Sequence, residues 1–338
     1  MSTTFQPASP PPLNLCTTLT ESKRILNAHS RHFLALSVLF LLPLSFSLTV
    51  YPTLQNLIAH SSRHNPRILL SHSAAFHETH VTSKLILLAL LFTLFTLALS
   101  LLAVGSIAYS VLHGFYGRPV KVASAIKSAF LCFFPLLITV LFVKLVVVGI
   151  LLASGLVFFS TIKGFDFMGY PIQLSSPVFV GVSAIMLFVL VVGLVYLQLN
   201  WGLVGVIVVV EGSWGIEPLK RSSYLVKGMK RVSLVLLLFF GFFAGVLLWA
   251  ASENLEAAGI GTNYERLSWG LVPQIVVAST LLTLLFLYNI ASYTILYMYC
   301  KAVHGELALE IAEEFAREYV SLPFDDGKVP HVVSVAYT

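Results

Sequence analysis

The sequence predicts an all-α fold, a polytopic bundle of six transmembrane helices with amphipathic helices at its cytosolic interface. Three observations predict it. The 338-residue chain contains six long apolar runs, and a helix needs roughly 20 residues to cross ~30 Å of hydrocarbon. Hydrophobic residues make up 57% of the chain and charged residues 10%, against about 25% charged in soluble domains. Backbone amides inside a bilayer need partners within their own segment, which favours helix in every run. We place the spans at residues 33–51, 85–112, 129–159, 177–210, 232–251 and 273–300.

The N-terminal segment is polar and proline-bearing, so we expect residues 1–17 to be disordered. It does not have the charged-then-apolar pattern of a cleavable signal peptide, which leaves membrane targeting to the first span. Thr18 is followed by Glu21 at the spacing of a capping box, which predicts the start of an amphipathic helix. This helix either lies on the cytosolic leaflet or packs against the ends of the bundle.

Three features predict irregularities within the spans. Pro43 should kink the first span, because proline removes a backbone donor. The third span is longer than a bilayer requires, so we expect it to tilt or to break near Ser154 and Gly155. Gly241 and Gly245 form a small-residue motif in the fifth span, and we expect it to pack within the chain rather than between two copies.

The distribution of basic residues predicts the orientation. With both termini in the cytosol, the cytosolic segments carry fourteen of the twenty lysine and arginine residues, and the opposite loops carry five. The positive-inside rule favours this arrangement. The net charge of +5 then reflects cytosolic loops and not a nucleic-acid partner. We expect an integral membrane protein of the endomembrane system (endoplasmic reticulum or Golgi) or the plasma membrane.

The end of the chain differs in charge from the cytosolic loops. Residues 301–338 contain seven acidic residues against three basic ones, and apolar residues recur there at helical spacing. The chain therefore divides into the N-terminal segment, a six-span membrane domain at 18–304, and an acidic cytosolic tail at 305–338. We expect this tail to dock on the basic loops; a solvated acidic face is the alternative.

One motif in the sequence resembles a pattern found in other membrane proteins. Glu211 ends the fourth span, and residues 218–228 read Pro-Leu-Lys-Arg-Ser-Ser-Tyr-Leu-Val-Lys-Gly. This pattern resembles the membrane domain attached to some bacterial glycerophosphoryl diester phosphodiesterases, in which an acid ends span four and a basic helix leads into span five. The whole chain is similar to a plant family of six-span membrane proteins with no assigned activity. The phosphodiesterase barrel is missing from this sequence, so the resemblance implies the membrane fold and not that reaction.

Lys144 lies well inside the third apolar run, where a lysine costs about 2.5–3.5 kcal/mol on insertion scales. Its side chain either extends to the far interface or fills a buried polar role. In the second case its candidate intramembrane partners are Gln198, Asn200 and Asn289.

Two further groups of polar residues lie outside the hydrocarbon. We expect Glu211 to pair with Lys220 or Arg221, because no second catalytic group accompanies it. Basic residues around it are candidates for anionic headgroup contacts. Five histidines fall in the first external loop; we expect a solvated loop, with metal binding and pH sensing as alternatives. The candidate ion-pair and headgroup residues are Glu211, Lys220, Arg221, Lys227, Lys230 and Arg231.

The sequence predicts no catalytic residue, no cofactor-binding residue and no metal ligand. The preferred function is therefore non-enzymatic. We expect a multi-pass protein that organises membrane lipid or partner proteins, with the bilayer, anionic headgroups and other membrane proteins as its partners. The alternatives are a small-solute transporter or channel and a lipid-modifying membrane enzyme. The predicted spans lack the repeated acidic residues and broken half-helices that usually mark a translocation path, and this counts against transport.

Overall fold

The computed structural model describes residues 14–63, 74–167, 177–259 and 264–312. The described residues form helices joined by short turns, and no strand occurs among them. The elements are α1 (Leu15–Ala28), α2 (Ser30–Leu36), the π-helical turn η1 (Ser37–Leu41), α3 (Leu42–Arg63), α4 (Ala74–Phe115), α5 (Val122–Phe167), α6 (Pro177–Trp201), α7 (Val204–Glu211), α8 (Glu217–Leu225), the 3-10 turn η3 (Val226–Gly228), α9 (Lys230–Gly259) and α10 (Tyr264–Val303). Residues 306–312 are also helical.

The predicted fold class is confirmed. Six helical segments of the described residues are long and apolar enough to cross a membrane, and each overlaps one predicted span. The chain is therefore an integral membrane protein. The spanning segments are Ser30–Pro52, Leu85–Phe115, Val122–Phe165, Phe179–Glu211, Lys230–Ser252 and Val272–Val303.

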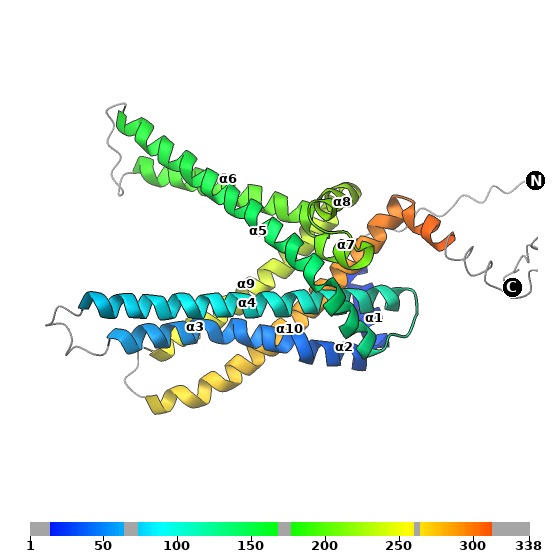
Figure 1. Cartoon of the computed structure of the whole chain (residues 1–338), viewed down its shortest axis with the longest axis horizontal. Helices are drawn as coiled ribbons and strands as arrows, with labels where there is room; N and C mark the ends of the chain where they lie inside the picture. Colours follow the sequence, from blue (N-terminus) through cyan, green and yellow to red (C-terminus); the bar gives the residue numbers. More distant parts are fainter. Residues whose placement is uncertain (1–13, 64–73, 168–176, 260–263, 313–338) are drawn as a thin grey trace, which may run out of the picture.

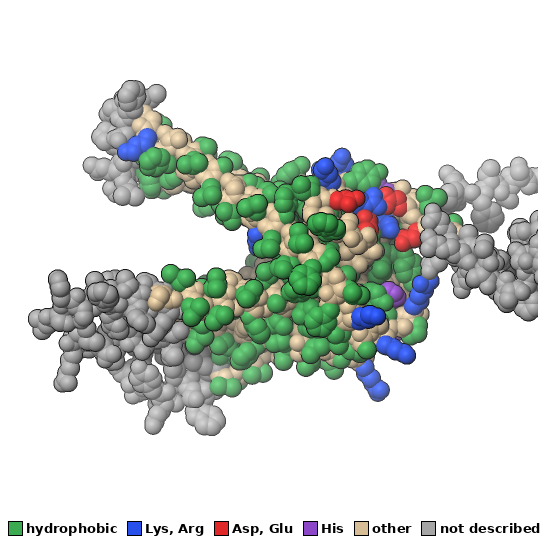
Figure 2. Space-filling view, viewed as in Figure 1, with side chains coloured by type: hydrophobic (Ala, Val, Ile, Leu, Met, Phe, Trp, Pro, Cys, Tyr) green, Lys and Arg blue, Asp and Glu red, His purple; other side chains and the backbone are tan. Residues whose placement is uncertain are grey.

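Short helices cover one end of the bundle. Figure 1 shows α1, α2, α7 and α8 at the end of the bundle where α4 and α10 also finish. We call this end, formed by α1, α7, α8 and residues 306–312, the capped end. Figure 2 shows most of the visible charged side chains gathered there, whereas hydrophobic side chains dominate the surface of the long helices. An even number of spans returns the chain to the side from which it started.

The α5–α6 hairpin diverges from the other long helices away from the capped end (Figure 1). No residue in the most apolar stretch of the Phe179–Glu211 span is buried within the protein. Large apolar side chains such as Phe188 and Leu152 are consequently exposed. Lipid, or another apolar surface, has to cover them.

The buried core lies between the helices near the capped end. Fully buried side chains there include Leu36 of α2, Ile107 of α4, Ile207 of α7 and Ile295 of α10. Hydroxyl side chains join the same helices: Ser22 of α1 lies 3.1 Å from Ser292 of α10, and Thr49 of α3 lies 2.9 Å from Ser279. Small polar side chains let membrane helices approach closely and hydrogen-bond to one another.

The first amphipathic helix begins earlier than the sequence predicts. Residues 1–13 of the predicted disordered segment lie outside the described residues, but Leu15, Cys16 and Thr17 are helical. Asn14 is the N-cap, and its backbone N–H donates to Thr17 Oγ1 at 2.9 Å. The predicted capping box at Thr18 is wrong, because Thr18 is buried inside the helix. Of the two predicted locations for this helix, packing on the bundle is the one observed.

The structure bears on two of the predicted irregularities. Pro43 follows η1, in which the backbone N–H of Leu42 bonds to the carbonyl of Ser37, five residues back. A wider turn of this kind accommodates the backbone carbonyl that a proline leaves without its i+4 donor. For the long third span the sequence predicts a tilt or a break; the predicted break at Ser154 or Gly155 is wrong, since α5 continues through both.

The fourth span is interrupted, which the sequence did not predict. The chain turns at Gly202 and Leu203 between α6 and α7. A Cβ atom on Gly202 would lie 2.9 Å from Tyr293 Cε1, so only glycine permits this contact with α10. The expectation that the spans contain no broken half-helices is wrong at this turn, and one argument against transport falls with it.

The small-residue motif of the fifth span is also different from its prediction. Gly241 and Gly245 lie on α9, and a Cβ atom added at either would meet nothing within 4 Å. Both glycines are exposed. The expected packing within the chain is therefore wrong.

Candidate functional site at the capped end

Helix α8 has two faces with different roles. Its sequence holds most of the Pro-Leu-Lys-Arg-Ser motif, and Leu219, Ser222 and Leu225 of that motif are buried. The Ser222 hydroxyl donates to the backbone carbonyl of Asn200 at 2.6 Å, which joins α8 to the end of α6. Lys220 and Tyr224 are exposed on the other face. The apolar and hydroxyl positions of the motif thus anchor α8, and its lysine positions remain available to bind ligands.

Arg221 is the centre of an ion-pair network that joins three segments. Its Nε donates to Glu211 Oε1 of α7 at 3.2 Å. Its Nη1 donates to Glu306 Oε1 at 2.9 Å, and its Nη2 also donates to Glu306. The hydroxyl of Tyr297 on α10 donates to Glu211 Oε1 at 2.8 Å. We call Glu211, Arg221, Tyr297 and Glu306 the latch.

The latch shifts the pKa values of two of its members, Glu306 and Arg221, in opposite directions. Hydrogen bonds from Arg221 hold the pKa of Glu306 below its ordinary value, although partial burial opposes this shift. Hydrogen bonds to Glu306 raise the pKa of the Arg221 guanidinium, and Glu211 adds to the effect. All three charged side chains are about three-quarters buried, with Glu211 24% exposed. Partly buried, bidentate pairs of this kind contribute more than pairs on an open surface.

Residues that follow α10 are held by further contacts. Lys301 Nζ lies 2.7 Å from Glu310 Oε2. The imidazole ring of His304 packs on the ring of Tyr224, with the ring centroids 4.9 Å apart. Together with the Glu306 pair, these contacts dock residues 304–310 on α8 and α10, as the opposite charges of tail and loop predict. The tail from residue 313 onward lies outside the described residues.

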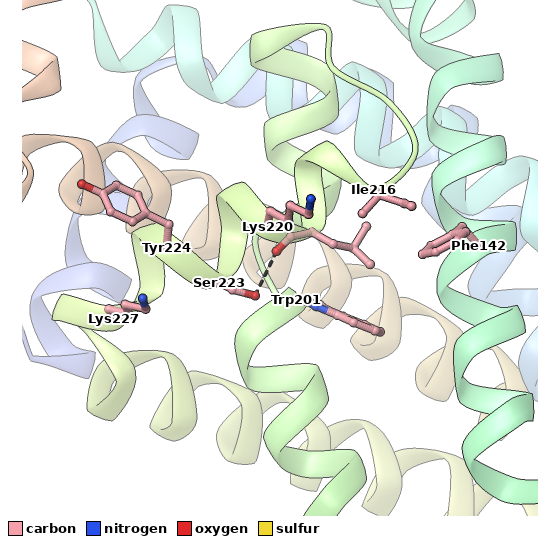
Figure 3. A pocket seen from close by; sticks show the side chains of 8 residues that line it. Phe142, Trp201, Ile216, Lys220, Ser223, Tyr224 and Lys227 are labelled. Carbon is pink, nitrogen blue, oxygen red and sulfur yellow. Dashed lines mark hydrogen bonds between the residues drawn. The ribbon is translucent and has the colours of Figure 1, made fainter. Parts of the chain in front are cut away.

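A hollow of about 430 Å³ lies beside the exposed face of α8. Figure 3 shows Lys220 and Ser223 between two groups of side chains, with Tyr224 and Lys227 on one side and Trp201 and Phe142 on the other. Trp201 ends α6 and Phe142 belongs to α5, so the apolar side of the hollow is continuous with the membrane-spanning helices. The hollow therefore pairs ammonium and hydroxyl groups with an apolar and aromatic wall.

Other predicted headgroup residues continue this exposed face. Lys227, Lys230 and Arg231 are exposed, and the ammonium of Lys230 lies 5.8 Å from the ring centroid of Tyr196. Arg221 differs from them, since the latch occupies its guanidinium. The predicted ion pair of Glu211 is present with Arg221 and not with Lys220.

The intramembrane candidates are not brought together. Lys144 and Gln198 are exposed, and no hydrogen bond or ion pair joins Lys144 to any residue that the structure describes. The side-chain nitrogen of Asn200 donates to the Tyr196 carbonyl at 2.8 Å. Oδ1 of Asn289 is buried without a hydrogen-bond partner among the described residues. The side chains of the five loop histidines lie outside the described residues.

One family model matches the chain, over residues 11–328, and its description is "Domain of unknown function (DUF8558)". The chain belongs to this family. The comparison with curated proteins and the comparison with solved structures each returned no match. The match to the DUF8558 model covers all six spans and the latch.

Two members of the latch could not be found from the sequence of this DUF8558 protein. Tyr297 is one of four tyrosines near the end of the sixth span, and no pattern distinguishes it from the others. Glu306 is one of seven acids in the tail, and only the turn at Gly305, with φ of 76°, directs its helix back toward α8.

Proposed function

We propose that this DUF8558 protein is a non-enzymatic membrane protein of the endomembrane system or plasma membrane. Its capped end faces the cytosol, where it organises anionic lipids and the proteins next to them. One observation carries the proposal: α8 is anchored through one face and presents Lys220, Ser223 and Lys227 beside an apolar hollow on the other.

The chemistry of this hollow suits a phospholipid headgroup. The ammonium groups of Lys220 and Lys227 bind phosphate oxygens, while the Ser223 hydroxyl donates to the Leu219 carbonyl at 2.9 Å and can only accept a further hydrogen bond. Trp201 and Phe142 provide apolar contact for the adjoining part of an acyl chain. A headgroup bound here would contact the same helix that carries the latch, so lipid binding and docking of residues 304–310 would be coupled.

Fluorescence quenching tests this proposal at the hollow itself. A variant with Trp214→Phe, Trp249→Phe and Trp269→Phe retains Trp201 as its single tryptophan. In nanodiscs, brominated phosphatidylserine should quench Trp201 more strongly than brominated phosphatidylcholine. Lys220→Gln with Lys227→Gln should reduce this preference roughly 30-fold, at about 1 kcal/mol per lysine.

The matched control is Lys121→Gln with Lys127→Gln, which removes the same charge from two other exposed lysines before and within α5. It should leave quenching of Trp201 unchanged. Equal quenching by the two lipids in the unaltered hollow, or equal effects of the two lysine pairs, would refute the proposed lipid site.

Transport of a small solute is the second candidate, because the interrupted α6–α7 span resembles the discontinuous helices of transporters. Cysteine accessibility distinguishes it from the first. With Cys16, Cys132 and Cys300 replaced by serine, Gln198→Cys should react with a charged thiol reagent from both sides of the membrane if a solute path exists. Protection from both sides contradicts transport along this route.

A further inference from the structure

A second hollow, of about 610 Å³, lies between α1, α9 and α10. Its walls are aromatic on α9, where Phe239 and Phe243 contribute, and aliphatic on α10, where Leu281 and Leu284 contribute. Phe243 is 43% exposed and Leu284 49% exposed, so the hollow is open along its length. Both helices span the membrane here, and the open side therefore faces hydrocarbon.

The hollow has the length of an acyl-chain segment. On α9 its lining runs from Phe239 to Leu247. At 1.5 Å per residue this is roughly 12 Å, or about two-fifths of a ~30 Å hydrocarbon core. A lipid chain that lies in this groove starts at the capped end and follows the helices toward the middle of the bilayer.

The head of the groove is polar and is built by α1. Lys23 and Thr20 of α1 line it there, together with Tyr288 of α10. The hydrogen bond between Ser22 and Ser292, and the buried side chain of Thr18, fix α1 on α10, so the backbone that carries Lys23 is held at the head of the groove. The groove is consequently a preformed site with a cationic end.

Two polar groups at this head have no partner among the described residues. Lys23 forms no ion pair with any residue that the structure describes, and Glu21, the acid closest to it along α1, pairs with Arg24 at 3.3 Å. Within the described part of the chain, the Tyr288 hydroxyl has no hydrogen-bond partner. At a membrane interface such groups gain free energy by binding the phosphate and ester oxygens of a lipid.

We propose that this groove binds one anionic phospholipid, which joins α1 to α9 and α10. The phosphate binds Lys23, the Tyr288 hydroxyl donates to a phosphate or glycerol-ester oxygen, and one acyl chain lies against Phe239, Phe243 and Leu284. The positive charge at the head selects an anionic lipid over a zwitterionic one. The site is separate from the hollow beside α8 and does not depend on it.

Photolabelling in membranes tests the proposal. The full-length protein is reconstituted with phosphatidylserine, or with phosphatidylcholine, that carries a photoreactive group in its acyl chain, and labelled peptides are mapped by mass spectrometry. Phosphatidylserine should label residues 239–247 and 281–288 more strongly than phosphatidylcholine. Lys23→Gln should lower the phosphatidylserine labelling about fivefold and leave the phosphatidylcholine labelling unchanged.

Three further variants make the result decisive. Arg24→Gln removes the same charge from the same helix one residue away, and it should retain the labelling because Glu21 already occupies Arg24. Lys23→Arg should also retain it, which separates charge from folding. Leu284→Trp fills the groove and should abolish labelling by both lipids.

Some outcomes overturn the proposal. Equal labelling by the two lipids, or equal losses in Lys23→Gln and Arg24→Gln, would show that no anionic site exists. Cross-links between two copies through residues 239–247 would show that a second chain occupies the groove. Lys220→Gln with Lys227→Gln should leave labelling at this groove unchanged, so failure at the α8 hollow and failure here are distinguishable.

Discussion

Tyr297 of α10 donates a hydrogen bond to Glu211 of α7 at 2.8 Å, although the two residues lie 86 positions apart in the chain. Arg221 of α8 donates to the same carboxylate oxygen at 3.2 Å. One glutamate therefore joins the last span, the interrupted fourth span and the amphipathic helix. A change to Glu211 should therefore affect the contacts among α7, α8 and α10 together.

Removal of the Tyr297 hydroxyl should destabilise the protein. The side chain is fully buried, and its partner is an ionised carboxylate. Tyr297→Phe should cost about 1.5–3 kcal/mol, the value of a hydrogen bond to a charged group. Thermal unfolding in a mild detergent measures it. Tyr196→Phe, at an exposed tyrosine of α6, is the control and should leave the transition temperature unchanged. Equal transition temperatures for all three proteins would show that the bond contributes nothing.

Loss of Arg221 should release residues 306–312 from the latch. Arg221→Gln leaves the carboxylates of Glu211 and Glu306 without a cation, whereas Glu306→Gln leaves Arg221 paired with Glu211. We expect Arg221→Gln to release residues 306–312, because a charged group without its partner is costly. Hydrogen exchange of the backbone amides in 306–312 reports this release. Lys220→Gln, the neighbouring exposed position, should not change the exchange, and protection that survives in Arg221→Gln would contradict the expectation.

Acid should open the latch at its Glu306 contact. Arg221 lowers the pKa of Glu306 in the folded protein below its ordinary value of 4.5. Stabilisation from this pair is thus fully present above pH 4.5 and is lost as the pH falls through the lower, folded pKa. A spin label at Leu309, an exposed position, should gain mobility only in that range. The same label in Glu306→Gln should be mobile already at pH 7. A gain in label mobility near pH 6 would contradict the assignment of this transition to Glu306.

The interruption of the fourth span should depend on glycine at position 202. Gly202→Ala places its Cβ 2.9 Å from Tyr293 Cε1, so the tyrosine ring has to move. We expect a loss of about 1–3 kcal/mol, as for other overpacked sites. Gly241→Ala is the control, since its Cβ would meet nothing within 4 Å and alanine favours helix. The free energy of unfolding should fall for Gly202→Ala and rise for Gly241→Ala.

Lys144→Met should raise stability. The ammonium is exposed on α5 inside a spanning segment and bonds to no residue that the structure describes. Replacing the lysine with methionine removes part of the free-energy cost of placing a charged side chain in the membrane, which is about 2.5–3.5 kcal/mol. The thermal transition in nanodiscs should rise, while quenching of Trp201 at the α8 hollow and photolabelling at the second groove should be unaffected. A properly folded variant that loses lipid labelling would indicate that Lys144 has a functional role.

The sequence by itself determines that this protein spans a membrane six times, because runs of about 20 apolar residues admit one backbone state in hydrocarbon. It also determines the amphipathic nature of α1 and α8, since both follow from the spacing of apolar and charged residues. The spans and the amphipathic helices depend on local composition, so they can be predicted without knowing which helices contact one another.

Only the tertiary structure decided which polar residues meet and where the helices depart from regular geometry. Tyr297 and Glu306 join the latch because α10 and the turn at Gly305 direct them to Arg221, and no spacing in the chain encodes that distance. Gly202 interrupts a span because Tyr293 of another helix packs against it, whereas Gly241 and Gly245 face open space despite their motif. Contacts between distant segments depend on packing, which a periodic pattern of apolar residues leaves undetermined.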